Sequence, residues 1–347
     1  MNKFIMFYII LIFTVFFSSK LISNNIFESD EYEVNFISDN VDKLKLEKLR
    51  EIKKTSLNSI FNNILNKENY IIQKRNLNED FINTFIKSIN FKNEKIINNN
   101  YHAKIKINFD KKLIINYLRE ENIPYVEYHP QKLLIIINEN KEITNYLFSK
   151  KNLHYNFLLN NKKLFNNFYF IPNLDVNDRY LLNINDIKNN KFEKINNFKK
   201  KYFDIDTIFI FSNEIDGNIF YEIFFYNDNK FNLIKKFKNN NYQYQKLFYE
   251  LKPIILEKWK NLNQIQNIKI NKINCEISYF NFLELKEIRK KITNNSIIKK
   301  INLKSFSLKN NLYDIYYFGD KNILFELFER NNLIVNYNNE ICKIKLK

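Results

Sequence analysis

The chain has 347 residues, a formal net charge of +17 and 45% hydrophobic residues. This length predicts two or three domains, and the apolar content is sufficient for sizeable cores, which excludes a chain disordered throughout. Asn, Lys, Ile, Phe and Tyr, the residues of A/T-rich codons, fill most positions, and the basic residues are scattered without a long uninterrupted block. We therefore interpret the positive charge as compositional and expect no nucleic-acid partner.

The amino terminus has the pattern of a secretory signal peptide. A short positive region, Met1 to Lys3, precedes an uncharged apolar run of fourteen residues, Phe4 to Phe17. Such a run is short for a membrane span and fits the apolar region of a leader, so we predict a signal peptide over residues 1–23. No A-x-A cleavage site is present, and an uncleaved anchor is the alternative. We expect membrane contact only through this segment.

An N-terminal α/β domain is predicted over residues 28–128. Apolar residues at helical spacing and alternating runs predict its elements. Asp110 is the expected N-cap of the last helix, and Pro124 prevents its continuation. The polar run KNEKIINNN is expected to close the helical part of the domain. In chain order we expect a strand over 31–37, helices over 41–65 and 78–89, a strand over 103–109 and a helix over 110–121.

A middle α/β domain is predicted over residues 129–263. It begins with KLLIIIN, residues 132–138, whose continuous apolar run is typical of a buried parallel strand. Asp216-Gly217 is a hairpin signal between two apolar β runs. The remaining expectations are helical segments over 142–148, 153–165 and 192–202, β runs TIFIFS, IFYEIFFY and FNLIKKF, and a helix over 242–262 that bends at Pro253.

The last domain, residues 264–347, has elements in the order β-α-β-β-α-β, which predicts a ferredoxin-like module. The fold class is therefore α/β (α+β), multi-domain, with small mixed-sheet modules. Cys275 and Cys342 are the two cysteines of the chain. They have no C-x-x-C spacing, and the sequence leaves open whether they form one bridge or remain two buried thiols.

Several short motifs resemble one family of exported proteobacterial proteins. They are Phe109-Asp110 followed by spaced apolar residues, Ile123-Pro124, IPNLDVNDR at residues 171–179, and the final block of strand, glycine and helix. The chain resembles domain of unknown function 2066 over nearly its whole mature length. It departs from the family pattern at His129-Pro130, where Arg-Pro is usual, and at Cys342, where Trp is usual. The resemblance implies the domain order and no activity, substrate or cofactor.

The candidates for chemistry are Asp175, Asp178 and Arg179. Two carboxylates three residues apart can face the same way on a helical turn and bind a cation or divide acid and base roles. The alternative is structural, with both carboxylates capping a turn and a helix and Arg179 as their partner. We favour this alternative, because the segment lacks the glycine and the other ligands of a calcium loop.

The other motifs indicate no catalytic, metal or cofactor site. His102, His129 and His154 stand apart from any metal-ligand spacing. No nucleophile elbow is present, and Gly217 and Gly319, the only glycines, cannot form a phosphate-binding loop. We therefore predict a non-enzymatic binding or assembly factor of the periplasm or cell envelope, with envelope proteins or an envelope polymer as partner. The alternatives are an envelope hydrolase or metal-dependent enzyme centred on Asp175 and Asp178, and a basic nucleic-acid-binding protein.

Overall fold

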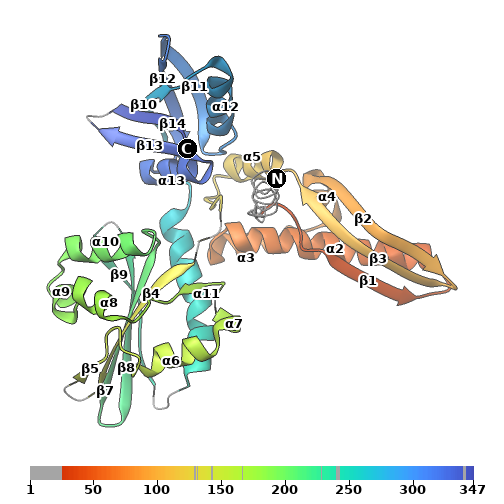
Figure 1. Cartoon of the computed structure of the whole chain (residues 1–347). Coiled ribbons are helices and arrows are strands. Elements are labelled where there is room, and N and C mark those ends of the chain that lie inside the picture. Colours follow the sequence, from red (N-terminus) through yellow and green to blue (C-terminus); the bar gives the residue numbers. More distant parts are fainter. Residues whose placement is uncertain are drawn as a thin grey trace, which may run out of the picture. The chain divides into compact units, whose positions relative to one another are not determined.

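The computed structural model describes residues 26–128, 130, 132–141, 144–165, 167–227, 229–239, 243–338 and 341–347. The predicted signal peptide and His129 lie outside these residues. The chain forms two compact units, residues 1–60 with 77–113, and residues 61–76 with 114–347. The fold class is as predicted, because helices pack with three sheets, of which one is antiparallel and two are mixed (Figure 1).

The first unit is built on a three-stranded antiparallel sheet of order β1-β3-β2. Its central strand β3 buries every second side chain, as expected for a strand with one face on a core. Asp110 caps the following helix by accepting from the backbone N–H of Lys112 at 2.8 Å. The elements from β1 to α5 are β1 Tyr32–Ile37, α2 Val41–Ile64, α3 Lys67–Arg75, α4 Glu79–Phe85, β2 Ile86–Ile97, β3 Asn100–Phe109 and α5 Lys111–Glu120.

Two predictions in this region are wrong. The helix expected over 78–89 ends at Phe85, and the polar run expected to close it belongs to strand β2. Asn98 and Asn99 both adopt positive φ, 48° and 61°, which is the backbone of a tight hairpin turn between β2 and β3. Pairing with β3 thus overrides the helical spacing of the apolar residues. Helix α3 was not anticipated.

The middle domain holds a six-stranded sheet of order β5-β4-β7-β8-β9, with β6 also paired to β4. Strand β4 is buried along its apolar run and runs parallel to β6 and β7, as predicted. Its elements are β4 Leu133–Lys141, β5 Thr144–Asn145, α6 Leu153–Asn160, α7 Lys162–Phe165, β6 Tyr169–Phe170, α8 Val176–Leu181, α9 Ile184–Lys188, α10 Phe192–Lys201, β7 Thr207–Ile215, β8 Asn218–Asn227, β9 Lys230–Asn239 and α11 Tyr244–Asn263.

Strand β4 lies between β6 and β7, so its two parallel neighbours stand on opposite sides of it. The chain passes through α6 and α7 to β6 on one side, then through α8, α9 and α10 to β7 on the other. Helices α6 and α11 cover one face of the sheet, and α8 to α10 cover the other (Figure 1). This order creates a topological switch point between the carboxyl ends of β4 and β7, where ligands bind in open α/β sheets.

The turn predictions of the middle domain have mixed outcomes. Asp216 and Gly217 form the predicted hairpin turn between β7 and β8, with φ of 49° and 71°. Pro253 lies inside α11 as expected. The helix expected over 142–148 is wrong for its described part, because Thr144 and Asn145 form β5, which folds back on the end of β4.

The C-terminal module contains the predicted β-α-β-β-α-β series, and the last two β runs of the sequence, LIVNY and ICKIKLK, form two separate strands, β13 and β14. Strand β12 lies between β10 and β11, which is the split βαβ arrangement. Strand β14 is parallel to β10 and separates it from β13, so the sheet order is β11-β12-β10-β14-β13. The elements are β10 Ile270–Ser278, α12 Phe282–Thr293, β11 Ile298–Ser305, β12 Asn310–Phe318, α13 Lys321–Arg330, β13 Leu333–Asn338 and β14 Ile341–Leu346.

A disulfide joins Cys275 of β10 to Cys342 of β14. The two residues are directly paired in the parallel register, with Cα atoms 4.5 Å apart, a separation that disulfides accept. Both side chains are fully buried. Of the two arrangements that the sequence left open, the structure has the bridge, and it fastens the last strand to the centre of the sheet.

Candidate functional site

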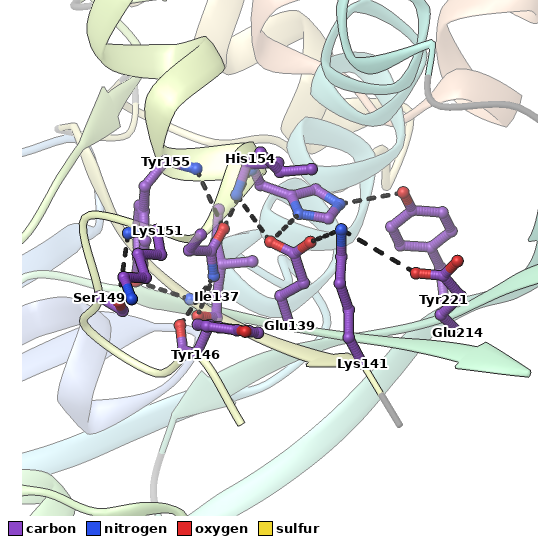
Figure 2. Close-up of polar contacts among 12 residues, drawn as sticks. Ile137, Glu139, Lys141, Tyr146, Ser149, Lys151, His154, Tyr155, Glu214 and Tyr221 are labelled. Carbon is purple, nitrogen blue, oxygen red and sulfur yellow. Dashed lines mark hydrogen bonds and ion pairs between the residues drawn. The ribbon is translucent and has the colours of Figure 1, made fainter. Parts of the chain in front are cut away.

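The middle domain contains a buried polar cluster on the α6 face of its sheet. Glu139 of β4 accepts a hydrogen bond from the backbone N–H of Leu153 at 2.7 Å, and its carboxylate lies 3.5 Å from Nδ1 of His154. On the other side of the imidazole, Nε2 is 3.0 Å from the hydroxyl of Tyr221. Nζ of Lys141 lies 3.2 Å from an oxygen of the Glu139 carboxylate and 4.0 Å from an oxygen of Glu214 (Figure 2).

The electrostatics of this cluster favour an ionised carboxylate. Burial by itself would raise the pKa of Glu139, but hydrogen bonding to His154, to the Leu153 N–H and to Lys141 lowers the pKa below its usual value. Burial, together with the nearby charge of Glu139, raises the pKa of Tyr221. The tyrosine therefore stays neutral in the range where the glutamate is charged.

The hydroxyl, imidazole and carboxylate are ordered as in an acid–base relay, but the cluster is closed to substrates. His154 is 0% exposed, Tyr221 1% and Glu139 2%. A catalytic base has to reach the proton that it removes, directly or through one water. We therefore interpret the cluster as a paired polar core that fixes α6 against β4 and β8. His154 is a buried core histidine, and His102 of the first unit is partly exposed with its Nε2 4.0 Å from a carboxylate oxygen of Glu33.

The cluster predicts a specific acid sensitivity. A carboxyl group whose folded pKa is lowered stabilises the fold above the unfolded value, here 4.5, and this contribution is lost as the pH falls through the folded pKa. We expect E139Q to lower stability at pH 7 by about 1 to 3 kcal/mol and to flatten the loss of stability between about pH 5 and pH 3.

The single Trp259, buried in α11, reports unfolding of this domain by its fluorescence. E214Q is the matched control, because Glu214 faces the same lysine from a more exposed position. Equal pH profiles for E139Q and the parent protein would contradict the role given to Glu139.

The sequence candidates Asp175, Asp178 and Arg179 lie at the start of α8 but do not form one site. Asp175 is the N-cap, accepting from the backbone N–H of Asp178 at 2.7 Å, and this bond lowers its pKa. Asp178 points inward and is 0% exposed. Arg179 is exposed, and both carboxylates form ion pairs with Lys201 instead.

Asp178 is fully engaged with its own chain. It accepts hydrogen bonds from Lys201 Nζ at 2.6 Å, from the backbone N–H of Leu174 at 2.8 Å and from the Tyr202 hydroxyl. Burial opposes the charged form of Lys201, but the bond to Asp178 raises the lysine pKa overall. These contacts are those of a structural ion pair that links α8 to the end of α10.

A cleft on the opposite face of the same sheet has a different character. Asn138 of β4 is paired with Phe211 of β7, which is paired with Glu222 of β8, so the three side chains form one row across the sheet. The neighbouring row begins with Asn140 and Asn213, whose amides are hydrogen-bonded at 3.2 Å. These residues stand at the carboxyl ends of β4 and β7, which is the switch point described above.

The cleft encloses about 410 Å³, within the range of small-ligand sites. Its lining combines amides, three partly exposed phenylalanines and one edge of α9: Asn138, Asn140, Asn145, Ile187, Lys188, Asn190, Phe211, Asn213, Glu222, Phe224 and Phe231. Asn138 is 4% exposed, and its Oδ1 has no hydrogen-bond partner among the described residues. This oxygen has almost no accessible surface, whereas the amides of Asn140 and Asn213 are partly exposed in the cleft.

A second hollow, of about 720 Å³, follows α11 near Pro253. Its polar groups are already paired with one another: Lys260 donates to the backbone oxygen of Leu65 at 2.9 Å, and Glu257 accepts from the N–H of Lys67 at 2.7 Å. The smaller cleft between β4 and β7 is therefore the better candidate site.

The sequence did not single out this cleft. A signal was present, because the buried strands LLIII and TIFIFS are each followed directly by asparagine, Asn138 and Asn213. In a chain so rich in asparagine this signal could not be distinguished from composition.

No group of three or more His, Cys, Asp or Glu side chains able to hold a metal occurs in the described residues. Within the same residues, no helix has the length and apolarity to cross a membrane. Comparison with family models, curated proteins and solved structures finds no match to the chain. The resemblance to domain of unknown function 2066 therefore stays a prediction.

Proposed function

We propose that the protein is an exported, non-enzymatic binding factor of the periplasm or cell envelope. The leader pattern of residues 1–23 supports export. The disulfide between Cys275 and Cys342 supports it independently, because such bonds persist in oxidising compartments and are rare in the cytosol. Two observations support the binding role. The clusters around Glu139 and Asp178 are buried, and the cleft between β4 and β7 is open.

The ligand that fits the cleft is an uncharged saccharide segment of an envelope polymer. Amides donate and accept hydrogen bonds, as sugar hydroxyl and N-acetyl groups do. The electron-rich faces of Phe211, Phe224 and Phe231 suit the C–H edges of sugar rings. Glu222 is paired with Lys236, and the exposed Lys188 is the other charged side chain of the lining. The observation that carries the proposal is the pair of partly exposed amides, Asn140 and Asn213, beside Phe211 in the cleft at the switch point.

Calorimetric titration with an N-acetylglucosamine tetramer tests this proposal. We expect binding by the parent protein and about tenfold weaker binding by N140A/N213A, since two ligand hydrogen bonds are lost. N232A is the matched control, because Asn232 lies on the same sheet outside the cleft and bonds Asn227 at 2.7 Å. An oligomer of galacturonate serves as the charged probe.

The outcomes separate the alternatives. Absence of tetramer binding, or equal binding by N140A/N213A and the parent protein, would overturn the saccharide assignment. Stronger binding of galacturonate would show that the overall positive charge, rather than the amides of the lining, selects the ligand. Capture of one envelope protein that the cleft variant no longer binds would replace the polymer by a protein partner.

A further inference from the structure

One end of the C-terminal module exposes a group of large apolar side chains, the apolar tip. It consists of the segment that leads from β10 into the first turn of α12 and of the loop between β11 and β12. Its side chains are between 71% and 94% exposed: Phe280, Phe282, Leu283, Phe306 and Leu308. Scattered exposed apolar residues are common, but five on two adjacent segments mark an interaction surface.

The two segments are fastened to each other. The backbone N–H of Tyr279 donates to the carbonyl of Lys309 at 3.0 Å, and the Tyr279 hydroxyl donates to the carbonyl of Ser307 at 2.9 Å. The ring of Tyr279 is buried beneath them. The phenylalanines and leucines therefore project together from a fixed base at the end of strands β10 and β12.

Three backbone N–H groups of the tip are hydrogen-bonded to side chains of the tip. Glu284 accepts from the N–H of Phe280 at 2.8 Å, and Asn311 Oδ1 accepts from the N–H of Ser307 at 3.2 Å. Ser307 Oγ accepts from the N–H of Asn310 at 3.3 Å. Internal pairing of backbone groups is what entry into a lipid environment requires, whereas a protein edge partner uses free backbone groups.

The charges around the tip are mainly cationic. Residues 278–289 and 303–311 contain four cationic side chains, Lys286, Arg289, Lys304 and Lys309, against the two carboxylates Glu284 and Glu287. Glu284 accepts a hydrogen bond from the backbone N–H of Phe280. A carboxylate oxygen of Glu287 lies 3.5 Å from Nζ of Lys291. Apolar side chains with a basic rim complement the interface of an anionic bilayer.

We propose that the apolar tip inserts into the interface of a bilayer containing anionic lipids. The phenylalanine and leucine side chains enter the acyl boundary while the lysines contact the headgroups. This contact is separate from the saccharide cleft and from the N-terminal segment, and it holds the C-terminal module on the membrane surface.

The test places a fluorescent reporter in the tip of the whole chain. F306W is mixed with vesicles of phosphatidylethanolamine and phosphatidylglycerol that carry brominated acyl chains. We expect a blue shift and quenching of the new indole, weakened by high salt, while the buried Trp259 is unaffected. In the F306W background, F280S and L308S are each expected to weaken partition on the order of tenfold. Because the readout is local, insertion of the N-terminal segment alone cannot produce it.

Y180W is the control, since Tyr180 is also exposed but lies on α8, away from the tip. Quenching of F306W without quenching of Y180W supports the proposal. No quenching of F306W, equal quenching of both, or a blue shift of F306W on adding solubilised envelope protein but not vesicles would overturn it. Equal quenching by purely zwitterionic vesicles would overturn the role of the basic rim.

Discussion

Loss of the Cys275–Cys342 disulfide is expected to destabilise the C-terminal module by about 4 kcal/mol. The bond closes a loop with a sequence separation of 67 residues, and chain-entropy models assign roughly 4 kcal/mol to a loop of this length. It also fastens β14, whose other neighbour is only the edge strand β13. We therefore expect C275A/C342A to lose protection first in these two strands.

Hydrogen exchange of the β13 and β14 amides measures this effect directly. The parent protein treated with reductant should exchange like C275A/C342A, and reductant should not change exchange in the variant. Unchanged protection of β14 in the variant would contradict the prediction. Thiol trapping in cells adds the test of compartment: export predicts two blocked cysteines, whereas two free thiols in the native protein would argue against it.

The elements that the sequence predicted correctly are those with local physical causes. Asp110 accepts from the backbone N–H group two residues on, which depends only on the helix start. Asp216-Gly217 meets the φ demands of a tight hairpin by itself. The apolar run of β4 admits few structures other than a buried strand.

The features that the sequence predicted wrongly or left open have non-local causes. At the start of residues 86–97 the apolar side chains have helical spacing, and the end of this segment is polar. The segment forms a strand because it pairs with β3. Cys342 reaches Cys275 only through the register of β14 beside β10. Neither pairing is encoded within a short window of sequence.

The candidate site depended on topology in the same way. Asn138 and Glu139 are consecutive, yet strand alternation sends one amide into the open cleft and one carboxylate to His154 on the other face. The sequence candidates were Asp175 and Asp178, two carboxylates that are close in the chain. The fold instead brings together groups that are distant in the chain. They meet beside β4, because its two parallel neighbours, β6 and β7, lie on opposite sides of it.

Removal of the Asp178 carboxylate is expected to cost about 3 kcal/mol of stability. D178A leaves Lys201, the N–H of Leu174 and the Tyr202 hydroxyl without their common acceptor, and breaking a buried pair on one side is costly. Lys201 keeps partial exposure, which places the expected cost at the lower end of the range for buried pairs.

D175A is the matched control, because Asp175 is an exposed N-cap on the same helix, and its loss is expected to cost about 1 kcal/mol. Urea unfolding followed by Trp259 fluorescence compares the two variants within one domain. D178A/K201M should recover part of the loss, since it removes the stranded charge. If D178A and D175A unfold at the same urea concentration, Asp178 is not held for stability, and the alternative of an enzyme centred on these carboxylates becomes the stronger hypothesis.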